Sequence, residues 1–521
     1  MGADVNRAVG PGTIARLAAC AVFALLLPRL DMPWGTDLAS VNGGFYMLSE
    51  MRAFEAAGWS NLAGIPHLGS LPTEPPIGNP YVHHPPGWPA LLFATTRLTG
   101  LDPWGLRLLP ALAAAATAGL LTWWLLVRGA PIAVTLLVVL SRPILHLYGP
   151  MPNPESIVAL LIVSGLLLDE KRREGRGWAL PALIAVVAVA PWMDWQGAFL
   201  VPAIWLRSAV ERRPWRRWKA EIAIAFVGTV SLLLLVTWLG HAVAHLDDVR
   251  RSLLGGNSNP DLSGSALVTG LRHMAHVATG STHAGPALGI AAWWSTLGTH
   301  FATMIGSWVL VAGFFVFGRH GHDVGRLAAL ALPGVLNIAL FRLHAANHDF
   351  WVIHLLPVAT WMFIAAITGG SRDARVRVLL AAIVAVMGIV TLMRERGVRD
   401  ASVSDVEARA VGIAGLTRSG IASAWVVPVA TASRHLRGHV VDLPIGEVRR
   451  LVDFARQGVL TGPIDVLVPE TTDVRTAIRA LPGEVPVVPL PLDAARDPTG
   501  ALATWAGTST MLRVEIPRTM R

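Results

Sequence analysis

The feature that most constrains this chain is a series of apolar runs, each close to the length that crosses a lipid bilayer as a helix. A spanning helix needs about 20 predominantly apolar residues. About eleven runs approach that length, and they cover residues 14–30, 106–127, 131–148, 155–169, 177–191, 195–210, 219–240, 297–317, 325–342, 350–370 and 376–394. A further run at 87–98 is too short to span and is typical of a helix lying on the membrane surface. We therefore expect an α-helical polytopic membrane protein.

The overall composition agrees with a membrane protein and argues against a nucleic-acid binder. Hydrophobic residues make up 53% of the chain and charged residues 15%, whereas soluble domains carry about 25% charged residues. The net charge of +9 arises mainly from arginines in short loops between apolar runs, as in cytoplasmic membrane loops. Cys20 is the single cysteine, which excludes a disulfide framework and a cysteine-based metal site.

The distribution of basic residues predicts the orientation. Arg7 precedes the first run and Arg16 lies near its start, and no signal-peptide cleavage site follows it, so we expect an uncleaved helix with a cytoplasmic N-terminus. The basic loops 169–177, 207–219, 318–326 and 371–377 then all lie on the cytoplasmic side. The short alternate loops 149–155, 192–197 and 342–349 together hold one arginine, Arg342. We predict a multi-pass protein of the inner (plasma) membrane.

This topology places the polar residues that look unusual for a membrane protein on the outer face. They include His83, His84, Glu155, Asp194, His348 and Asp349. Ionisable groups at membrane helix ends are costly and are often functional when they cluster. The alternative is that each one caps a helix, as Asp194 could do.

Two long loops, at 31–105 and 241–296, are predicted on the outer face. In the first, residues 41–59 have the spacing of an interfacial amphipathic helix, with Met51 and Phe54 on its apolar side and Glu50 elsewhere. His83-His84-Pro85-Pro86 cannot continue a helix, and we expect it to form a rigid floor there. The second loop carries Arg250 and Arg251, which either hold a phosphate or extend towards lipid headgroups.

The character of the chain changes near residue 396. Short β-branched runs at 425–430, 439–444, 464–470 and 485–490 alternate with helical patterns at 445–458 and 471–481. This alternation predicts a small α/β domain over 396–521, next to a transmembrane domain over 1–395. About eleven spans from a cytoplasmic N-terminus place this domain on the extracytoplasmic side. We find no nucleotide-binding motif in this region and no zinc-type spacing anywhere in the sequence.

Several motifs occur in an order that resembles a known family. They are NGGFYMLSEMRAFEAAGW (42–59), HHPPGWPALL (83–92), GLDPWGLRLLPALAAAATAGLLTWWLL (100–126), PNPE (152–155), WMDWQGAFLVPA (192–203) and NHDFWVIHLLP (347–357). The series resembles the GT-C membrane glycosyltransferases, in the branch of the protein O-mannosyltransferases and lipid A aminoarabinose transferases. The resemblance covers roughly residues 10–400.

The resemblance implies a GT-C fold and the transfer of a sugar, hexose or pentose, from a polyprenyl-phosphate donor at the outer face. The acceptor is a lipid, glycan or protein of the cell envelope. It also implies that an acid of the first outer loop is the general base, which suits attack by a hydroxyl group. Relatives carry acids immediately before the Asn of the NGxxY-like segment, but Ser40 and Val41 precede Asn42 here. Asp37 is therefore our candidate base.

The remaining candidate residues are assigned to substrate binding. They are Asn42, Tyr46, His83, His84, Glu155, Asp194, Arg250, Arg251, Arg342, His348 and Asp349. Histidine or cationic donors would stabilise the leaving phosphate. No cofactor is expected with certainty. A divalent metal stays open because His348 and Asp349 could add ligands to the histidine pair.

Two other functions remain. A transporter or flippase of lipid-linked sugars should have paired ionisable residues or broken helices near the middle of the membrane. A non-catalytic GT-C-like scaffold would explain the missing acids at Ser40 and Val41. Loss of sugar transfer on Asp37→Asn in a folded protein would separate the enzyme from both.

Overall fold

A computed structural model describes the following parts of the chain. They are residues 10–31, most of 47–71, 77–80, 84–211, 218–242, 321–340, 353–370, most of 373–393, most of 464–479, 486–493 and 508–516. The chain divides into two compact units, which are described separately. The helical unit comprises Met1–Leu30, His83–Trp88 and Arg107–Arg396, and the second unit comprises Asp31–Val82, Pro89–Leu106 and Gly397–Arg521.

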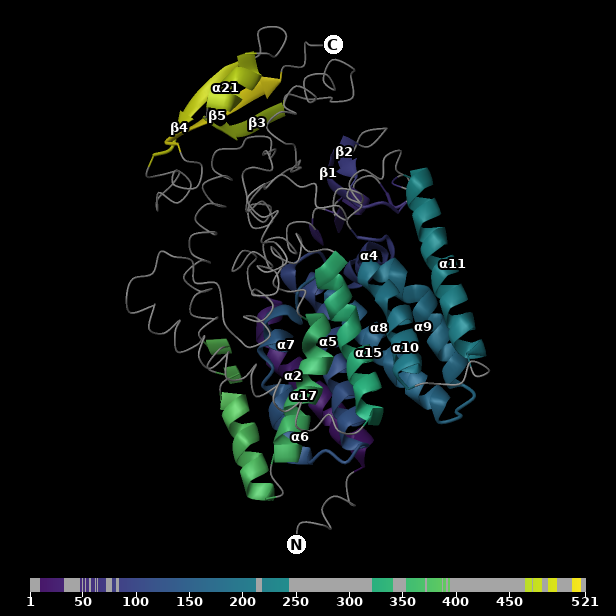
Figure 1. Cartoon of the computed structure of the whole chain (residues 1–521). Coiled ribbons are helices and arrows are strands. Elements are labelled where there is room, and N and C mark those ends of the chain that lie inside the picture. Colours follow the sequence, from purple (N-terminus) through teal and green to yellow (C-terminus); the bar gives the residue numbers. More distant parts are fainter. Residues whose placement is uncertain are drawn as a thin grey trace. The chain divides into compact units, whose positions relative to one another are not determined.

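The helical unit is a bundle of apolar helices (Figure 1). Its described helices are α2 (Pro11–Leu30), α5 (Pro103–Leu126), α6 (Ile132–Leu140), α7 (Pro143–Tyr148), α8 (Glu155–Arg173), α9 (Ala179–Met193), α10 (Leu200–Val210), α11 (Lys219–Ala242), α15 (Gly321–Leu340) and α17 (Leu356–Gly370). The first residues of α5 belong to the second unit. A 3-10 helix, η1 (Trp195–Phe199), precedes α10. Most described residues of 374–393 are also helical.

Three of the described helices are long and apolar enough to cross a membrane, judged by length and composition. They are Pro11–Leu30, Pro103–Leu126 and Lys219–Gly240. Ala179–Met193 and Ile353–Ala365 are shorter apolar helices. The predicted span at 297–317 lies outside the described residues. The total of about eleven spans therefore stays a prediction.

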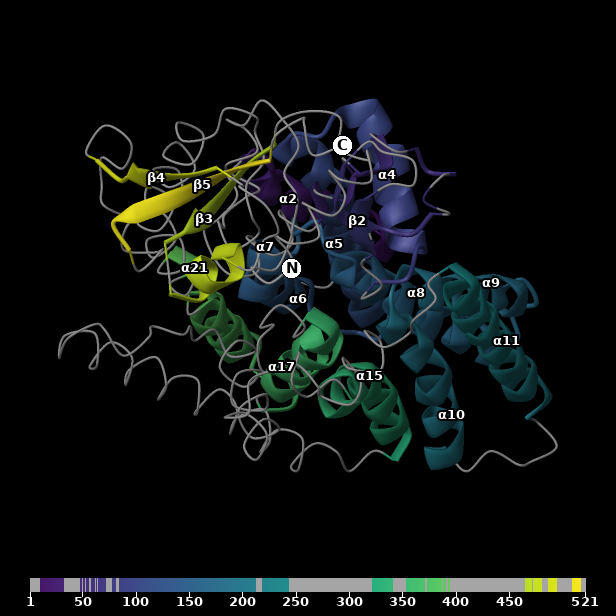
Figure 2. The same ribbon diagram turned by 90° about the horizontal axis from the view of Figure 1, so that it is seen from above.

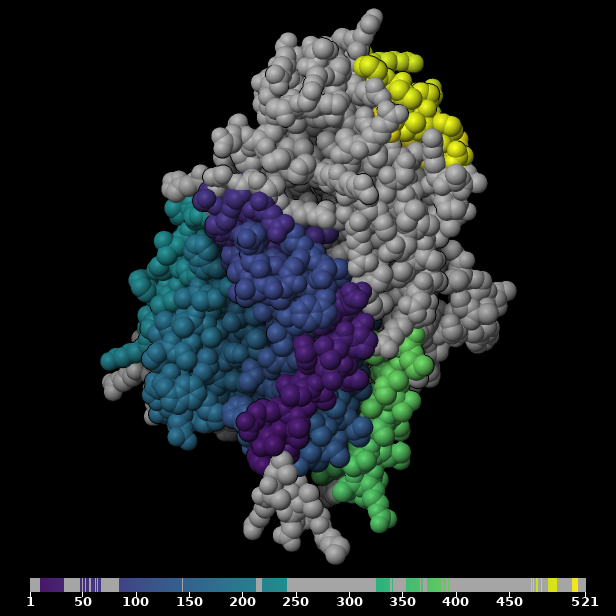
Figure 3. Space-filling view, turned by 180° about the vertical axis from the view of Figure 1, so that it is seen from behind, coloured from purple at the N-terminus to yellow at the C-terminus, as the bar shows by residue number. Residues whose placement is uncertain are grey.

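Helices α8, α9, α10 and α11 form one packed group, with α11 beside α9 and α15 against α10 (Figure 1 and Figure 2). Small residues allow the close contacts. A side chain at Gly165 on α8 would lie 2.4 Å from Leu200, and one at Gly119 on α5 would lie 3.0 Å from Ala19 on α2. Helix α2 lies on the surface seen in Figure 3. Its Leu17 and Leu25 side chains are exposed. A helix with one packed and one exposed apolar face is suited to border lipid.

Two predicted spans differ from their sequence assignment. The run 131–148 is broken into α6 and α7 at Ser141–Arg142, because Pro143 has no N–H to continue the α6 ladder. The run 195–210 begins as the 3-10 helix η1, and α10 starts only at Leu200. Apolar composition alone did not reveal either change.

In the second unit, the described residues between 47 and 55 are helical, as predicted for the first long loop. A two-stranded antiparallel sheet follows, made of β1 (His67–Leu71) and β2 (Ile77–Pro80). Most of α4 (Gly87–Thr99) also belongs to this unit. The rings of Phe54, Trp59 and Phe93 form a cluster with centroid distances of 4.6–6.3 Å.

The described part of the C-terminal region contains a three-stranded sheet and one helix. The strands β3 (Ile464–Pro469), β4 (Val487–Pro491) and β5 (Thr510–Ile516) have the order β3-β5-β4, and both pairings are antiparallel. Helix α21 (Thr472–Arg479) lies between β3 and β4 in the sequence. The predicted elements at 425–458 lie outside the described residues, so the α/β domain as a whole remains a prediction.

Candidate functional site

The segment that begins His84-Pro85-Pro86-Gly87-Trp88 is fixed against two helix ends. A side chain at Gly87 would come within 2.5 Å of the Trp192 carbonyl oxygen at the end of α9, so only glycine fits this approach. The indole Nε1 of Trp88 donates a hydrogen bond of 3.1 Å to the Pro152 carbonyl oxygen, just before α8. The prolines stop a helix from forming earlier, and these contacts set where α4 begins.

His84 and Asp194, both predicted site residues, come together at this point. Nδ1 of His84 lies 3.9 Å from Oδ1 of Asp194, and their side chains are 15% and 5% exposed. Asp194 joins the end of α9 to the start of η1 and accepts a hydrogen bond of 2.7 Å from the Trp195 N–H. The cap alternative for Asp194 is therefore correct, and the same carboxylate also faces the imidazole.

Glu155 begins α8, three residues after the carbonyl that binds Trp88. Its side chain is buried, as is that of Asn153. On the other side, Gln196 in η1 is buried, and its Oε1 has no hydrogen-bond partner in the described structure. Segments 84–88, 152–155 and 192–196 therefore meet at one end of the bundle, which we call the Glu155 end.

The Glu155 end combines groups that can hold and polarise a polar substrate. A carboxylate–imidazole pair can orient a ring nitrogen towards a phosphate oxygen, and buried amide and carboxyl groups can bind hydroxyls. The other predicted residues lie outside the described residues, namely Asp37, Asn42, Tyr46, His83, Arg250, Arg251, Arg342, His348 and Asp349. Within the described ranges, no group of three or more His, Cys, Asp or Glu side chains is placed to hold a metal ion.

Glu50 differs from its expected position on the first-loop helix. It is 0% exposed, as are Met47 and Met51, and Phe54 is 1% exposed, so the carboxyl shares the buried face at i, i+3 and i+4 spacing. Neither carboxyl oxygen has a hydrogen-bond partner in the described structure. Burial raises the pKa of Glu50 well above its usual value of 4.5, because the charged form loses its hydration. The expectation that Glu50 lies away from the apolar side was wrong.

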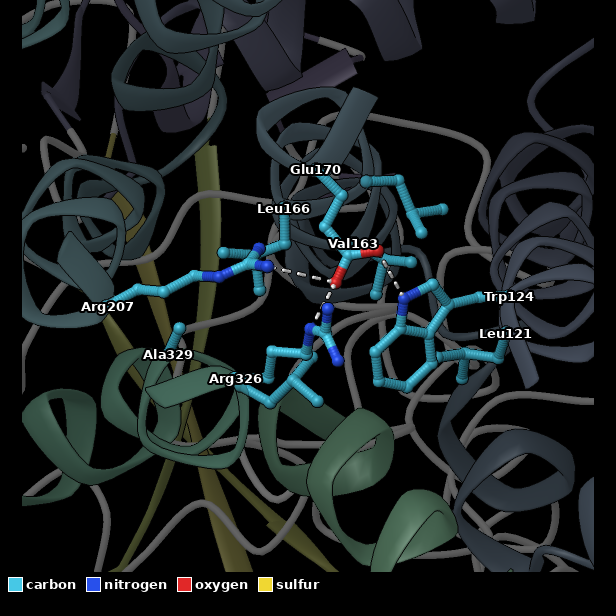
Figure 4. A pocket seen from close by; sticks show the side chains of 10 residues that line it. Leu121, Trp124, Val163, Leu166, Glu170, Arg207, Arg326 and Ala329 are labelled. Atoms are coloured by element: carbon cyan, nitrogen blue, oxygen red, sulfur yellow. Dashed lines mark hydrogen bonds and ion pairs between the residues drawn. The ribbon is translucent and has the colours of Figure 1, made fainter. Parts of the chain in front are cut away.

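A second cluster lies at the other end of α8, which we call the Arg173 end. Glu170 lines a pocket there between α5, α8, α10 and α15 (Figure 4). Its Oε1 lies 3.4 Å from Arg207 and 3.3 Å from Arg326, and its Oε2 accepts hydrogen bonds from Trp124, at 2.9 Å, and from Arg128.

Neighbouring charges extend this cluster. Asp169 accepts hydrogen bonds from Arg172 at 2.6 Å and from Arg173 at 2.5 Å. Arg172 also reaches Glu221 on α11 at 2.8 Å, and Arg173 reaches Glu211 after α10 at 2.6 Å. Most of these residues were assigned to basic loops, but they form ion pairs that join α8 to α11 and to the end of α10. The i, i+4 spacing of Asp169 and Arg173 was the available sequence signal.

A third polar group lies at the break between α6 and α7. Arg142 is 5% exposed, and its guanidinium stacks on the Phe363 ring of α17 at 4.3 Å. Its Nε donates a hydrogen bond of 3.2 Å to the Val138 carbonyl oxygen. Arg142 was not among the predicted site residues, although an arginine followed by a proline inside an apolar run is visible in the sequence.

Comparison with solved structures identifies the fold. The oligosaccharyltransferase of Archaeoglobus fulgidus in the apo form aligns with a TM-score of 0.51 at 14% identity, covering 95% of this chain and 71% of that chain. Its complex with Zn and sulfate aligns with a TM-score of 0.51 at 13% identity, covering 95% and 70%. ArnT from Cupriavidus metallidurans, bound to undecaprenyl phosphate, aligns with a TM-score of 0.46 at 13% identity, covering 97% and 98%.

Sequence comparisons add no closer relative. No protein-family model matches this sequence, and no curated protein matches it either. The fold therefore rests on the structural likeness, which agrees with the resemblance seen in the motifs. The chain has a GT-C fold.

Proposed function

From the premise of a GT-C fold, we propose that this chain is an integral membrane glycosyltransferase. It moves a sugar from a polyprenyl-phosphate donor to an acceptor of the cell envelope on the outer face of the inner (plasma) membrane. Its N-terminus is cytoplasmic, and its C-terminal domain lies outside. Two structures of a protein with the same fold, an archaeal oligosaccharyltransferase, support the reaction class.

One geometric observation carries this proposal. Three segments that are far apart in the sequence, 84–88, 152–155 and 192–196, bring buried polar groups to one end of an apolar bundle. Burying such groups costs free energy unless they are paired or used. Sugar transfer from a lipid-linked donor, the reaction that the fold family implies, needs polar groups of this kind at a membrane boundary.

The proposed step is a displacement at the anomeric carbon. The acceptor hydroxyl oxygen forms a bond to that carbon while the bond from the carbon to the donor phosphate oxygen breaks. Asp37 accepts the hydroxyl proton, as the family resemblance implies. The polyprenyl phosphate leaves with the bonding electron pair, and His84 donates a hydrogen bond to one of its oxygens.

The other candidate residues bind the two substrates in this proposal. Asp194 orients His84, because its carboxylate is fixed by the Trp195 N–H and lies 3.9 Å from the ring. Glu155 contacts sugar hydroxyls from the start of α8. The remaining contacts are assigned to Asn42, Tyr46, His83, Arg250, Arg251, Arg342, His348 and Asp349.

The test is sugar transfer by purified protein in native-like membranes. Labelled polyprenyl-phosphate sugars are offered with a cell-envelope extract to the wild type and to Asp37→Asn. We expect transfer by the wild type and a loss of about 100-fold or more in the variant, as for removal of a general base. Transfer that survives in Asp37→Asn would exclude Asp37 as the base. A parallel sample with a chelator tests whether a divalent metal is needed.

One observation favours a second function, movement of lipid-linked sugars across the membrane. The break between α6 and α7 places the buried Arg142 inside an apolar segment, and transporters use such discontinuous helices. Proteoliposomes with a fluorescent polyprenyl-phosphate sugar distinguish the two functions. Accelerated transbilayer movement without sugar transfer would support the transporter. If the protein shows neither sugar transfer nor lipid movement with any donor of a broad panel, the result would support the non-catalytic scaffold.

A further inference from the structure

We propose that Arg142, at the break between α6 and α7, is a binding site for the phosphate group of a membrane amphiphile. This inference rests on the proposed function, which supplies the ligand, the polyprenyl phosphate. This site is separate from the Glu155 end, where His84 contacts the donor phosphate during transfer. The lipid phosphate binds the Arg142 guanidinium inside the bundle, and its chain extends along the apolar helices.

The backbone at the break explains only part of the Arg142 geometry. Because Pro143 has no N–H, the end of α6 lacks donors for its last carbonyl groups. The Arg142 N–H turns to the Val139 carbonyl oxygen at 3.3 Å, and the side-chain Nε takes the Val138 carbonyl oxygen at 3.2 Å. His146 satisfies the Leu140 carbonyl oxygen through Nε2 at 2.7 Å. A neutral donor could therefore perform the same backbone task.

The positive charge of Arg142 is what remains unexplained. Throughout the described residues, no carboxylate pairs with this guanidinium, and its neighbour on α17 is the uncharged ring of Phe363. At the Arg173 end, by contrast, the equally buried Arg207 contacts Asp169, Glu170 and Glu211. An unpaired buried cation is costly, and anion binding would remove that cost.

A phosphate suits the position and the free donors. With Nε bound to Val138, the two terminal nitrogens of the guanidinium keep their N–H groups for a planar pair of oxygens, the geometry in which arginine binds phosphate. The six residues of α7 separate Arg142 from Gly149, which is about 9 Å of helix. An anion this far inside an apolar bundle needs an apolar remainder, as a polyprenyl phosphate has.

The site is tested by ligand binding to the full chain in nanodiscs of zwitterionic lipid. The probes are undecaprenyl phosphate, undecaprenol, phosphatidylglycerol and inorganic phosphate. The proteins are the wild type, Arg142→Gln, and the matched control Arg375→Gln, which removes the same charge from an exposed arginine. We expect undecaprenyl phosphate to bind at least about tenfold more weakly to Arg142→Gln, as for loss of a charge-assisted hydrogen bond. Arg375→Gln should bind like the wild type.

Each outcome either supports or overturns the site. Equal binding of undecaprenyl phosphate by the wild type and Arg142→Gln overturns it, as does undecaprenol binding as tightly as the phosphate. If inorganic phosphate displaces undecaprenyl phosphate at an equal concentration, the ligand is not a lipid and the assignment is overturned. If phosphatidylglycerol gives a stronger Arg142-dependent signal than undecaprenyl phosphate, the site is assigned to phosphatidylglycerol. If Arg142→Gln does not fold, Phe363→Leu keeps the charge and removes the stacked ring. A smaller but measurable loss of affinity is then expected, and an unchanged affinity overturns the site.

Sugar transfer, measured separately, distinguishes this inference from the proposed function. If lipid binding depends on Arg142 but the wild type transfers no sugar, the Arg142 site is supported and the transferase function is contradicted. If the wild type transfers sugar but binds the lipid as tightly as Arg142→Gln does, the transferase function is supported and the Arg142 site is contradicted.

Discussion

At the scale of single residues, two buried carboxyl groups lie in different hydrogen-bond environments. Asp194 lies between two helical segments, where its oxygen accepts the Trp195 N–H and faces His84. Glu50 lies on the buried face of the first-loop helix without a hydrogen-bond partner in the described structure. The first carboxyl is stabilised as an acceptor, whereas the second is stable mainly in its protonated, uncharged form.

The burial of Glu50 predicts that the stability of the protein falls as the pH rises. Its pKa is raised in the folded state, so the folded state keeps the proton while the unfolded state loses it. The contribution of Glu50 is complete below its pKa in the unfolded state, which is close to the usual value of 4.5. It declines as the pH rises towards the folded pKa, because the unfolded state then releases a proton that the folded state still holds. Glu50→Gln should therefore melt like the wild type near pH 4.5 and at a higher temperature near pH 8.

The control for this experiment is Glu55→Gln, on the same helix. The Glu55 carboxylate is 41% exposed and lies 3.9 Å from Arg97. Its replacement should change the melting temperature little at either pH, because exposed ion pairs contribute about 0–1 kcal/mol. A difference between wild type and Glu50→Gln that is the same at both pH values would contradict the prediction.

Two substitutions of Asp194 should separate its role as a helix cap from the role of its negative charge. Asp194→Ala removes the acceptor of the Trp195 N–H and should lower the free energy of unfolding by about 0.5–2 kcal/mol. Asp194→Asn keeps an oxygen at the cap but removes the charge that faces His84. We expect near wild-type stability and a fall of about tenfold in sugar transfer, equivalent to about 1.4 kcal/mol. Thermal melting and transfer assays on both variants check this; equal activity of Asp194→Asn and wild type would exclude a positioning role.

At the scale of elements, the sequence predicted where most helices lie but not how they are interrupted. Hydropathy located α8, α9 and α11, because a long apolar run in a membrane protein must satisfy its backbone as a helix. It could not show the break at Arg142, because His146 and Arg142 satisfy the free carbonyl groups through contacts that require the folded structure. Glu50 was misplaced for a related reason: an acid is normally assigned to the exposed face.

Close packing between helices gives a prediction at this scale. A side chain at Gly228 on α11 would lie 2.6 Å from Val201 and 3.2 Å from Val187. Gly228→Ala should therefore cost about 1–3 kcal/mol by overpacking, although alanine favours helices. Gly240→Ala, on the same helix, has nothing within 4 Å and should be neutral or stabilising. Melting temperatures of the two variants decide this, and a Gly228→Ala protein as stable as Gly240→Ala would contradict the packing of α11 against α9 and α10.

At the scale of the helical unit, polar groups gather at both ends of α8. The motifs predicted the Glu155 end, since His84, Glu155 and Asp194 were all candidates, and the structure brings His84 and Asp194 together. The Arg173 end was missed because many of its pairs join residues far apart in the sequence, as in Arg173 with Ser208, Arg172 with Glu221 and Glu170 with Arg326. Loop composition shows charge but not these partners. The candidate base Asp37 lies outside the described residues and rests on the family resemblance.

The ion pairs at the Arg173 end should hold the helical unit together. Glu170 contacts Arg207 on α10, Arg326 on α15 and both Trp124 and Arg128 at the end of α5. Glu170→Gln leaves these cations with less compensation in a buried place, so we expect a loss of about 3–5 kcal/mol and a clearly lower melting temperature. Glu174→Gln is the matched control, because Glu174 is 50% exposed and pairs with Lys171, and we expect a loss of about 0–1 kcal/mol. Thermal melting in detergent compares the two, and because burial limits screening, the effect of Glu170→Gln should persist at high salt. Equal melting temperatures for both variants would mean that these helices are held by apolar packing alone.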